Sequence, residues 1–390
     1  MIKKQPNLCK QADDCSGCAT CSAACPVNAI VFQYDGEGFL YPKVDDSRCV
    51  GCLSCERVCA YKKDICIPIT EKENTRIYAA KIKNRDILLN SSSGGMFTAL
   101  SDFFLEQNGM VVSCIYSYES DAVLFSFIED KSMRDLARGS KYIQAEVGDA
   151  FLKVINWLAD NPNRNMLVVG TGCQIAGLDL LLREKKLRER VVLVDLICHG
   201  AASPKLWKDF IHRVEEKNGG VIDYLAFKDK RNKWEAPRTF AKIHETELSI
   251  KPYADWFYMG WSLRESCYNC PYTKIDRNSD ITIGDFWGIQ NIMPDFYDEM
   301  GVSLLITHSA EGERVFNGIK NDITFRESNR ADCLQPRLIK PQTRPKDRDM
   351  FWRDMIEKGL DYCENRYFEH YKIPFRRKII EHAKKVFRRK

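Results

Sequence analysis

Eight cysteines near the amino end occur in two copies of one spacing pattern. Residues 15–26 read CSGCATCSAACP and residues 49–60 read CVGCLSCERVCA, so the pattern C-x2-C-x2-C-x3-C appears twice. Where two [4Fe-4S] clusters share such runs, the first three cysteines of a run bind one cluster and the fourth binds the other. The sequence therefore predicts one cluster held by Cys15, Cys18, Cys21 and Cys59, and a second held by Cys49, Cys52, Cys55 and Cys25.

A zinc ribbon is the alternative, because it also uses C-x2-C pairs. Zinc needs four ligands per site and would leave the last cysteine of each run unused, whereas two clusters account for all eight. Pro26 follows the first run, as in bacterial ferredoxins, while Ala60 stands at the matching place in the second. Cys9 and Cys66 lie outside the pattern, and ordinary packing is expected for them.

A second, scattered group consists of four cysteines further along the chain. Cys173 and Cys198 each follow an apolar strand candidate, and Cys267 and Cys270 form a C-x2-C pair. Parallel strands would bring the first two to the same edge of a sheet, where α/β proteins bind cofactors. The four thiols could hold zinc or a third [4Fe-4S] cluster, and unligated buried cysteines are the third alternative.

Two polar segments precede or follow predicted elements in ways that suit a bound nucleotide. Residues 90–95 read NSSSGG and open the predicted helix MFTALSDFFLEQ, so hydroxyls, glycine amides and a helix amino end could cradle a phosphate. Residues 138–144 read RGSKYIQ and combine a cation, a ring and an amide after a glycine turn. A plain helix cap and an ordinary strand edge are the alternatives for these weak motifs.

The elements that must position these residues follow from hydrophobic patterning. Apolar strand candidates occur at IYAAKI, MVVSCIY, AVLFSFI, MLVVG and VVLVDLI, separated by helix candidates. This alternation predicts a mixed α/β domain with a largely covered sheet. Between the two cysteine runs, AIVFQYDGEGFLYPKVD alternates and turns at Asp35-Gly36, which predicts a short hairpin.

Composition narrows the classes of protein. The start of the chain has no apolar export signal and no run is long enough to span a membrane, so we expect a reducing, cytoplasmic setting in which clustered cysteines bind metal. Residues 375–390 carry eight Lys or Arg against one Glu, so residues 1–374 have a net charge of −2 and nucleic-acid binding is not expected. The basic stretch predicts an amphipathic helix that either packs on the body or rests on an anionic membrane surface or acidic partner.

The ordered motifs SSSGG, GSKYIQ, GTGCQIAGL, DLICHG, SCYNCPY and SDITIGDFWG resemble the family of coenzyme F-420 hydrogenase/dehydrogenase beta subunits, with a two-cluster ferredoxin in front. The similarity covers roughly residues 15–310. It implies a non-covalently bound FAD beside a third [4Fe-4S] cluster. By this resemblance the cluster ligands are Cys173, Cys198, Cys267 and Cys270, and the FAD contacts are Ser91, Ser92, Ser93, Gly94, Gly95, Gly139, Ser140, Lys141, Tyr142 and Gln144.

One departure from the family pattern is Gly172, where proline usually precedes the first cysteine, and a looser turn is expected there. Asp285, in the last motif, is expected to have a structural or cofactor-lining role. No catalytic acid or base is identifiable, and flavin chemistry can proceed without one because the isoalloxazine takes up the electrons.

The sequence thus predicts an α+β or α/β protein of three parts: a two-cluster ferredoxin module (residues 1–70), an α/β domain binding FAD and the third cluster (76–345), and a helical basic extension (346–390). The expected function is that of a flavin-dependent iron–sulfur oxidoreductase that relays electrons between a one-electron partner such as ferredoxin and a small-molecule substrate. The alternative is an electron-transfer subunit of a separate hydrogenase or dehydrogenase. The substrate and any oligomer formation are left open.

Overall fold

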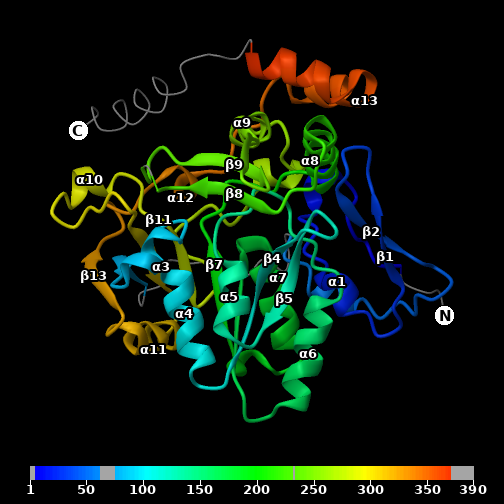
Figure 1. Ribbon diagram of the computed structural model, residues 1–390. Helices are drawn as coiled ribbons and strands as arrows, with labels where there is room; N and C mark the ends of the chain where they lie inside the picture. The colour runs from blue at the N-terminus through cyan, green and yellow to red at the C-terminus, as the bar shows by residue number, and fades with distance from the viewer. Residues whose placement is uncertain (1–4, 62–74, 232, 370–390) are drawn as a thin grey trace.

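The computed structural model describes residues 5–61, 75–231 and 233–369 (Figure 1). An eight-stranded mixed sheet forms the centre of the molecule, in the order β13-β3-β12-β11-β7-β6-β4-β5. Its strands are β3 (Arg76–Ile82), β4 (Met110–Ser117), β5 (Ala122–Ile128), β6 (Met166–Thr171), β7 (Val191–Leu196), β11 (Ile281–Asp285), β12 (Ser303–Thr307) and β13 (Ile323–Ser328). The central strands β4, β6, β7 and β11 run parallel, and the outer pairs are antiparallel.

Helices cover both faces of this sheet, which explains why its central strands are apolar at successive positions. On β6, for example, Leu167 packs among residues of the helices on one face and Val168 among those on the other. The covering helices are α4 (Met96–Leu105) and α11 (Ala310–Ile319) on one face, and α6 (Ala150–Asp160) and α7 (Gly172–Glu184) on the other. The shorter helices of this part are α3 (Arg85–Leu89), α5 (Lys131–Ala137), α10 (Ile289–Ile292) and α12 (Pro336–Ile339).

A second, three-stranded antiparallel sheet lies above the main sheet in Figure 1. It consists of β8 (Tyr224–Asp229), β9 (Arg238–Ile243) and β10 (Thr246–Ser249), and the helices beside it are α8 (Pro204–Asn218), α9 (Lys251–Met259) and α13 (Arg348–Glu364). Its core is strongly aromatic, with Trp207, Tyr253, Trp256 and Phe351 all buried.

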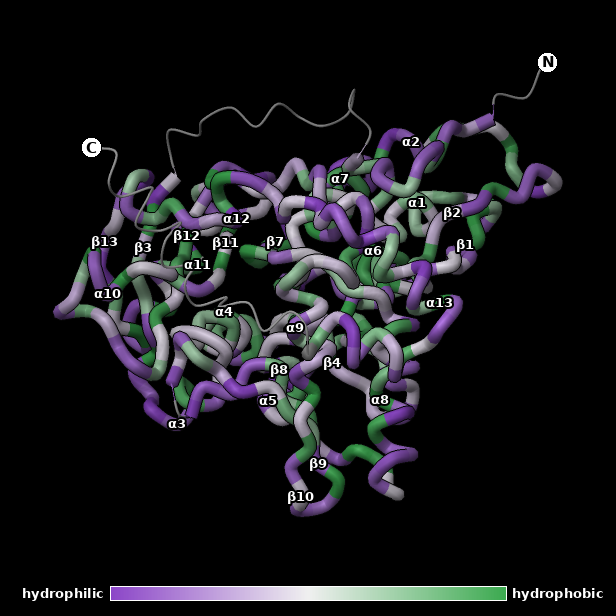
Figure 2. Tube along the Cα trace, turned by 90° about the horizontal axis from the view of Figure 1, so that it is seen from above, coloured by the Kyte–Doolittle hydropathy of each residue, from purple (hydrophilic) through white to green (hydrophobic). Residues whose placement is uncertain are grey.

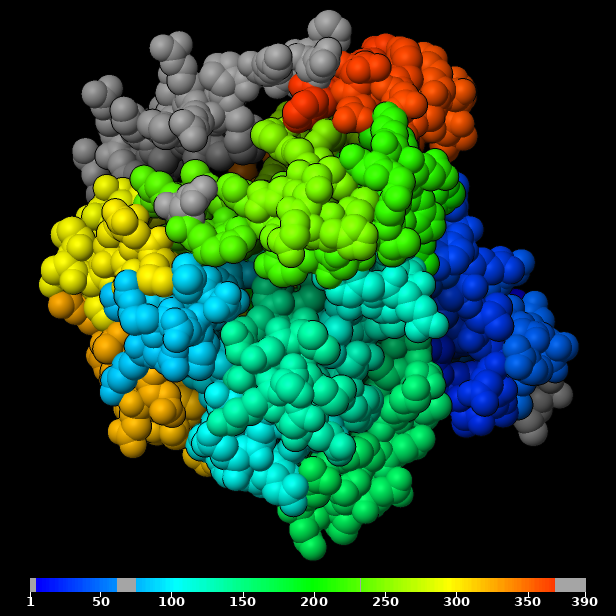
Figure 3. Space-filling view, in the orientation of Figure 1, coloured from blue at the N-terminus to red at the C-terminus, as the bar shows by residue number. Residues whose placement is uncertain are grey.

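The amino-terminal module contains a hairpin of β1 (Ile30–Tyr34) and β2 (Leu40–Val44), and the short helices α1 (Thr20–Ala23) and α2 (Ser54–Arg57). It lies along one side of the body in Figure 3, and Figure 2 shows its hairpin on the side of the molecule opposite β13 and β3. Arg348, which is buried, pairs with Glu37 at the hairpin tip. The module is therefore docked by a buried ion pair as well as by packing.

The five predicted strands and the hairpin are confirmed, with the hairpin turn closed by Asp35, whose carboxylate accepts hydrogen bonds from the Glu37 and Phe39 amides. The sequence did not predict β12, β13 or the second sheet. The described part of the chain contains no helix long and apolar enough to cross a membrane. The predicted helix at 375–390 and Cys66 lie outside the described residues.

A glycine on α7 fixes how closely the module approaches the body. A Cβ at Gly177 would lie 2.3 Å from Thr20 Oγ1 and 3.1 Å from Cys18 Sγ. Gly177→Ala should therefore weaken docking by about 1–3 kcal/mol through overpacking, even though alanine favours a helix by about 1 kcal/mol. Limited proteolysis of the module measures the effect. Gly36→Ala, whose Cβ would meet nothing within 4 Å, is the control, and equal protection in the two variants would contradict this contact.

Candidate iron–sulfur and flavin sites

The four predicted ligands of the first amino-terminal cluster lie within electrostatic range of one another. Burial raises the pKa of Cys21 well above its usual value, and the neighbouring thiols of Cys18, Cys15 and Cys59 raise it further. The Gly17 amide and the Thr20 hydroxyl donate hydrogen bonds of 3.3 Å to Cys15 Sγ and Cys18 Sγ, respectively. Donors of this kind stabilise thiolates and tune the potentials of clusters that thiolates bind.

The four predicted ligands of the second cluster line one small cavity. Cys25, Cys49, Cys52 and Cys55 all face it, together with apolar residues such as Val44. The Ala29 amide donates to Cys25 Sγ at 3.2 Å, and the Gly51 amide donates to Cys49 Sγ at 3.4 Å. Cys52 is exposed, so this set lies close to the surface of the module.

The scattered cysteines come together at the carboxyl end of two neighbouring parallel strands, as expected. Cys173 is the second residue of α7, which directly follows β6, and Cys198 follows β7. Burial raises the pKa of Cys173 well above its usual value, with further contributions from Cys270, Cys198 and Cys267. Burial likewise raises the pKa of Cys198 to about 11 and that of Cys267 to about 12.

A looser turn was expected before Cys173. The local contacts instead hold this turn closely. The Thr171 amide donates to Gln174 Oε1 at 3.0 Å, which caps the amino end of α7. A Cβ at Gly172 would lie 3.0 Å from the Cβ of Tyr272. Glycine therefore fits here because the Tyr272 side chain packs directly against it.

The sulfur atoms are too far apart for a single metal ion. Tetrahedral Zn–S bonds of about 2.3 Å place sulfurs about 3.8 Å apart. Among the described residues, the one group of three or more His, Cys, Asp or Glu with ligand atoms within 4.8 Å of one another is Asp121, His212 and Glu215 on the surface. Within these fully described cysteine sets, no three sulfurs of one set lie within that distance of one another, as a tetrahedral zinc site would require, whereas a cubane with four separate iron atoms has no such requirement.

The first cluster set and the scattered set meet at a seam. Tyr61, two residues after Cys59, is close enough to Cys270 and Cys173 for these thiols to raise its pKa, although burial is the larger cause. Tyr272, two residues after Cys270, donates a 2.7 Å hydrogen bond to the Ala60 carbonyl. Two separately bound cofactors would therefore be neighbours across residues 59–61.

The two segments predicted to bind FAD meet at the Ser92 and Ser140 hydroxyls, which are 2.9 Å apart. Other members of the first segment already have partners within the protein: Ser93 Oγ donates to the Val302 carbonyl, and the Gly94 amide donates to Ser303 Oγ. A Cβ at Gly94 would lie 2.3 Å from the Ala80 carbonyl oxygen. Gly94 thus lets the segment approach the sheet, and Ser92 and Ser140 stay available to a ligand.

Two more predicted FAD contacts in the first segment, Ser91 and Gly95, stabilise the turn before α4. Ser91 Oγ donates to the Ile87 carbonyl at 2.6 Å, and Gly95, at φ +83°, adopts the left-handed conformation that precedes the helix. In the second segment, Gly139 also has a positive φ of +85°, and a Cβ there would meet nothing within 4 Å. That side of Gly139 is open.

Lys141, Tyr142 and Gln144 make contacts that the sequence did not predict. Lys141 Nζ donates to the Ala137 and Arg138 carbonyls at the end of α5, and burial lowers its pKa to about 8. The Tyr142 ring stacks on Phe257 at 4.5 Å. Gln144 donates to the Ser16 carbonyl and so touches the amino-terminal module. Their assignment as FAD contacts stays a prediction.

Sequence reasoning missed a polar cluster beside the two serines. Lys230 is buried and donates to the Ser93 carbonyl, and burial lowers its pKa to about 7. Lys228 pairs with Asp285, which also accepts from Trp234 Nε1 at 2.9 Å. Both lysines come from the basic run KDKRNK at the end of β8. Such a run of charged residues is typical of a solvent-exposed turn.

One further buried polar atom lies near this cluster. Among the described residues, His199 Nε2 has no hydrogen-bond partner, and its ring packs against Phe257, the ring on which Tyr142 stacks. A buried, unpaired ring nitrogen carries an energetic cost unless a ligand satisfies it. Together with the open Gly139 and the two serine hydroxyls, it fits a bound polar cofactor.

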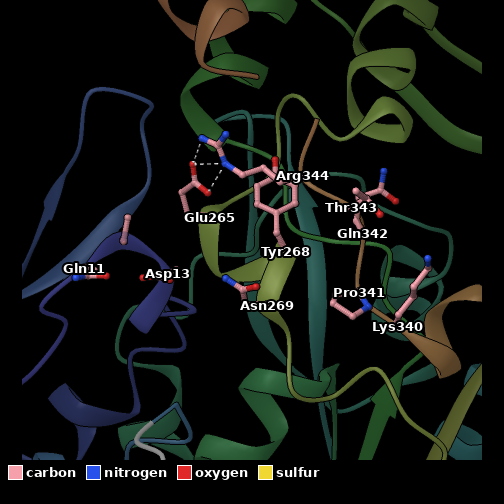
Figure 4. A pocket seen from close by; sticks show the side chains of 11 residues that line it. Gln11, Asp13, Glu265, Tyr268, Asn269, Lys340, Pro341, Gln342, Thr343 and Arg344 are labelled. Carbon is pink, nitrogen blue, oxygen red and sulfur yellow. Dashed lines mark hydrogen bonds and ion pairs between the residues drawn. The ribbon is translucent and has the colours of Figure 1, made fainter. Parts of the chain in front are cut away.

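A cleft of about 750 Å³ lies elsewhere (Figure 4). Its lining includes Asp13 of the module, Glu265 and Tyr268 beside the scattered cysteines, and Arg344. Arg344 is paired with Glu265, as the dashed lines in Figure 4 mark. None of the predicted FAD contacts lines this cleft.

Two family models match the chain. The model for the carboxy-terminal part of the coenzyme F420 hydrogenase/dehydrogenase beta subunit matches residues 163–331, which contain all four scattered cysteines. The model for a 4Fe-4S dicluster domain matches residues 14–63, which contain both amino-terminal sets. The serine segments lie between the two matched ranges.

The chain is 24% identical over 338 residues to the F subunit of the F(420)H(2) dehydrogenase of Methanosarcina mazei, covering 81% of this chain and 85% of that protein. A chain of the F420-reducing [NiFe] hydrogenase complex from Methanosarcina barkeri is 15% identical, with a TM-score of 0.45, and the match covers 77% of this chain and 92% of that one. The family matches and their order along the sequence lead to one conclusion: a 4Fe-4S dicluster domain at residues 14–63 is followed, at residues 163–331, by a carboxy-terminal domain of the coenzyme F420 hydrogenase/dehydrogenase beta-subunit family.

Proposed function

We propose that this protein is an electron-transfer iron–sulfur flavoprotein, a subunit of a coenzyme F420-linked oxidoreductase. The observation that carries the proposal is the seam at residues 59–61. A ligand of the first cluster, Cys59, begins a three-residue segment that ends in Tyr61 beside Cys173 and Cys270. A cluster held by the module would therefore lie close, through packed protein, to one held by the scattered cysteines, and electrons could pass between them.

A third [4Fe-4S] cluster accounts for the scattered cysteines better than zinc or unligated thiols. The wide spacing of the sulfurs argues against one zinc ion. Unligated thiols would not need four cysteines from three separate segments of chain at one sheet edge. Burial disfavours a bare thiolate at each of them, and bound iron would supply the missing positive charge.

FAD is the second proposed cofactor, and it fits the region of Ser92 and Ser140. A bound flavin would take up two electrons and release them one at a time, which joins hydride chemistry to iron–sulfur clusters. Lys230, which donates to the Ser93 carbonyl, and the Lys228–Asp285 ion pair place polar groups beside the serines. Ser140 donates to Ser92 Oγ, and the Ser92 hydroxyl remains to donate a hydrogen bond to an anionic group.

Two functions follow from this arrangement, and they differ in the substrate chemistry of the isolated chain. An electron-transfer subunit with its own hydride-accepting flavin should react directly with reduced coenzyme F420, the coenzyme named in the match to the Methanosarcina mazei protein. A subunit that only conducts electrons should react only when a partner protein delivers them.

Anaerobically purified full-length protein should contain about twelve iron atoms, because three cubanes hold four each. Cys173→Ser should reduce this to about eight while leaving the amino-terminal clusters intact. Iron and acid-labile sulfide analysis measures the content. The matched control is Cys333→Ala, at a buried cysteine outside the three sets, which should keep all the iron. Wild-type protein with about eight irons would rule out the third cluster.

Reduced coenzyme F420 should bleach the flavin absorbance of the isolated wild-type chain. Ser140→Leu should lower bound FAD at least tenfold and abolish the bleaching, since the larger apolar side chain displaces the hydroxyl that pairs with Ser92. Its iron content should not change. Ser120→Leu, in an exposed turn, should behave like the wild type. Bleaching that needs an added partner protein would favour the subunit that only conducts electrons.

A further inference from the structure

Arg264 is a buried arginine whose charge has no carboxylate partner in the described part of the chain. Its exposed fraction is 1%, and no ion pair involves it there, although other buried arginines, such as Arg277 and Arg348, pair with acids. Burying a guanidinium without a counter-charge is costly. An unpaired charge of this kind marks a place where an anion belongs.

The contacts of Arg264 indicate which anion that is. Its Nε donates to the Cys15 carbonyl at 2.7 Å, and its Nη2 lies 3.7 Å from Cys15 Sγ. The same Nη2 donates to the Leu40 carbonyl at 2.9 Å. All these partners belong to the amino-terminal module, so the guanidinium reaches across the docking interface to a predicted cluster ligand.

The environment of Arg264 holds the guanidinium in this one position. The planar group stacks over the Tyr41 ring at 4.0 Å, and Nη1 donates to Gln144 Oε1 at 3.2 Å. Gln144 in turn donates to the Ser16 carbonyl at 2.8 Å. Even a Cβ at Gly17 would come within 2.8 Å of Nη1. The charge is therefore fixed beside Cys15 and shielded from water.

The backbone of Arg264 connects this interaction to the scattered cysteines. Its carbonyl accepts a 2.9 Å hydrogen bond from the amide of Cys267. One residue thus contacts a ligand of the first cluster through its side chain and a ligand of the proposed third cluster through its backbone.

Resting on the proposed function, we propose that Arg264 is a positioning residue that raises the reduction potential of the cluster bound by Cys15. One-electron reduction adds one negative charge to that cluster, and a fixed positive charge nearby stabilises the reduced form. Of the two clusters of the module, an electron would then favour the first, which lies next to the seam at residues 59–61.

The arginine beside the second cluster is placed differently. Arg57 donates to the Cys52 carbonyl at 3.0 Å, but it is paired with Glu184 and half exposed. Solvent and the paired carboxylate both weaken its field. The bias from Arg264 therefore acts on the first of the two clusters.

The test is a redox titration of the full-length, anaerobically purified protein, followed by electron paramagnetic resonance. Arg264→Gln should lower the midpoint potential of one cluster by at least about 59 mV, a tenfold change in the one-electron equilibrium constant. The other two clusters should titrate as in wild type. Arg264→Lys, which keeps the charge, should shift the potential less. Arg57→Gln, which removes a charge that Glu184 pairs and solvent screens, should shift the potential of its cluster less than Arg264→Gln does.

Unchanged potentials in Arg264→Gln at full iron content would overturn the inference, and so would an equal shift of all three clusters. If Arg264→Gln loses about four irons while Arg264→Lys keeps them, the charge is needed even for assembly, which supports the inference. Loss of iron in both variants would overturn the inference, because cluster assembly would then depend on the hydrogen bonds of the guanidinium and not on its charge. Wild-type protein without iron would instead refute the proposed function.

Discussion

A thiolate buried away from water is stable only beside a positive centre, and this requirement governs the architecture of the protein. Burial raises the pKa values of Cys18 and Cys21 in the first amino-terminal set and of Cys173 and Cys267 at the scattered site, which favours neutral thiols at these four positions without metal. Iron would reverse this preference. We therefore interpret the docking interface, with its buried Arg264 and its short seam, as a structure organised around metal-bound sulfur.

The docking interface gives the module a defined place on the body. Ion pairing of Glu37 with Arg348, the close approach at Gly177 and the hydrogen bond from Tyr272 to the Ala60 carbonyl fix it at three separated points. A rigid dock suits electron transfer because the donor and acceptor keep one separation. A loosely tethered ferredoxin would have to find its acceptor anew for every electron.

Hydrophobic patterning was enough to predict five core strands, and the ends of two of them predicted that Cys173 and Cys198 lie at one edge of the sheet. Ligands that lie close together along the chain, or directly after parallel strands, are brought together by local geometry, as Cys173 and Cys198 are. The region proposed to bind a flavin was harder to predict, because its polar residues come from distant segments. Lys228 and Lys230 reach it from a second sheet that the pattern did not reveal, while Lys141 turns back to cap α5. The role of Arg264 was not predicted, because a single arginine in a loop belongs to no motif or hydrophobic pattern.

The central claim is that the first cluster and the third are neighbours across residues 59–61. Electron paramagnetic resonance of the fully reduced protein tests it most directly, because nearby paramagnetic clusters split or broaden one another's signals. The account predicts an interaction in wild-type protein that disappears in Cys173→Ser, leaving only the coupling within the amino-terminal pair. The claim would be contradicted if the signals of the amino-terminal clusters were identical in wild type and variant while the wild type contained a reduced third cluster.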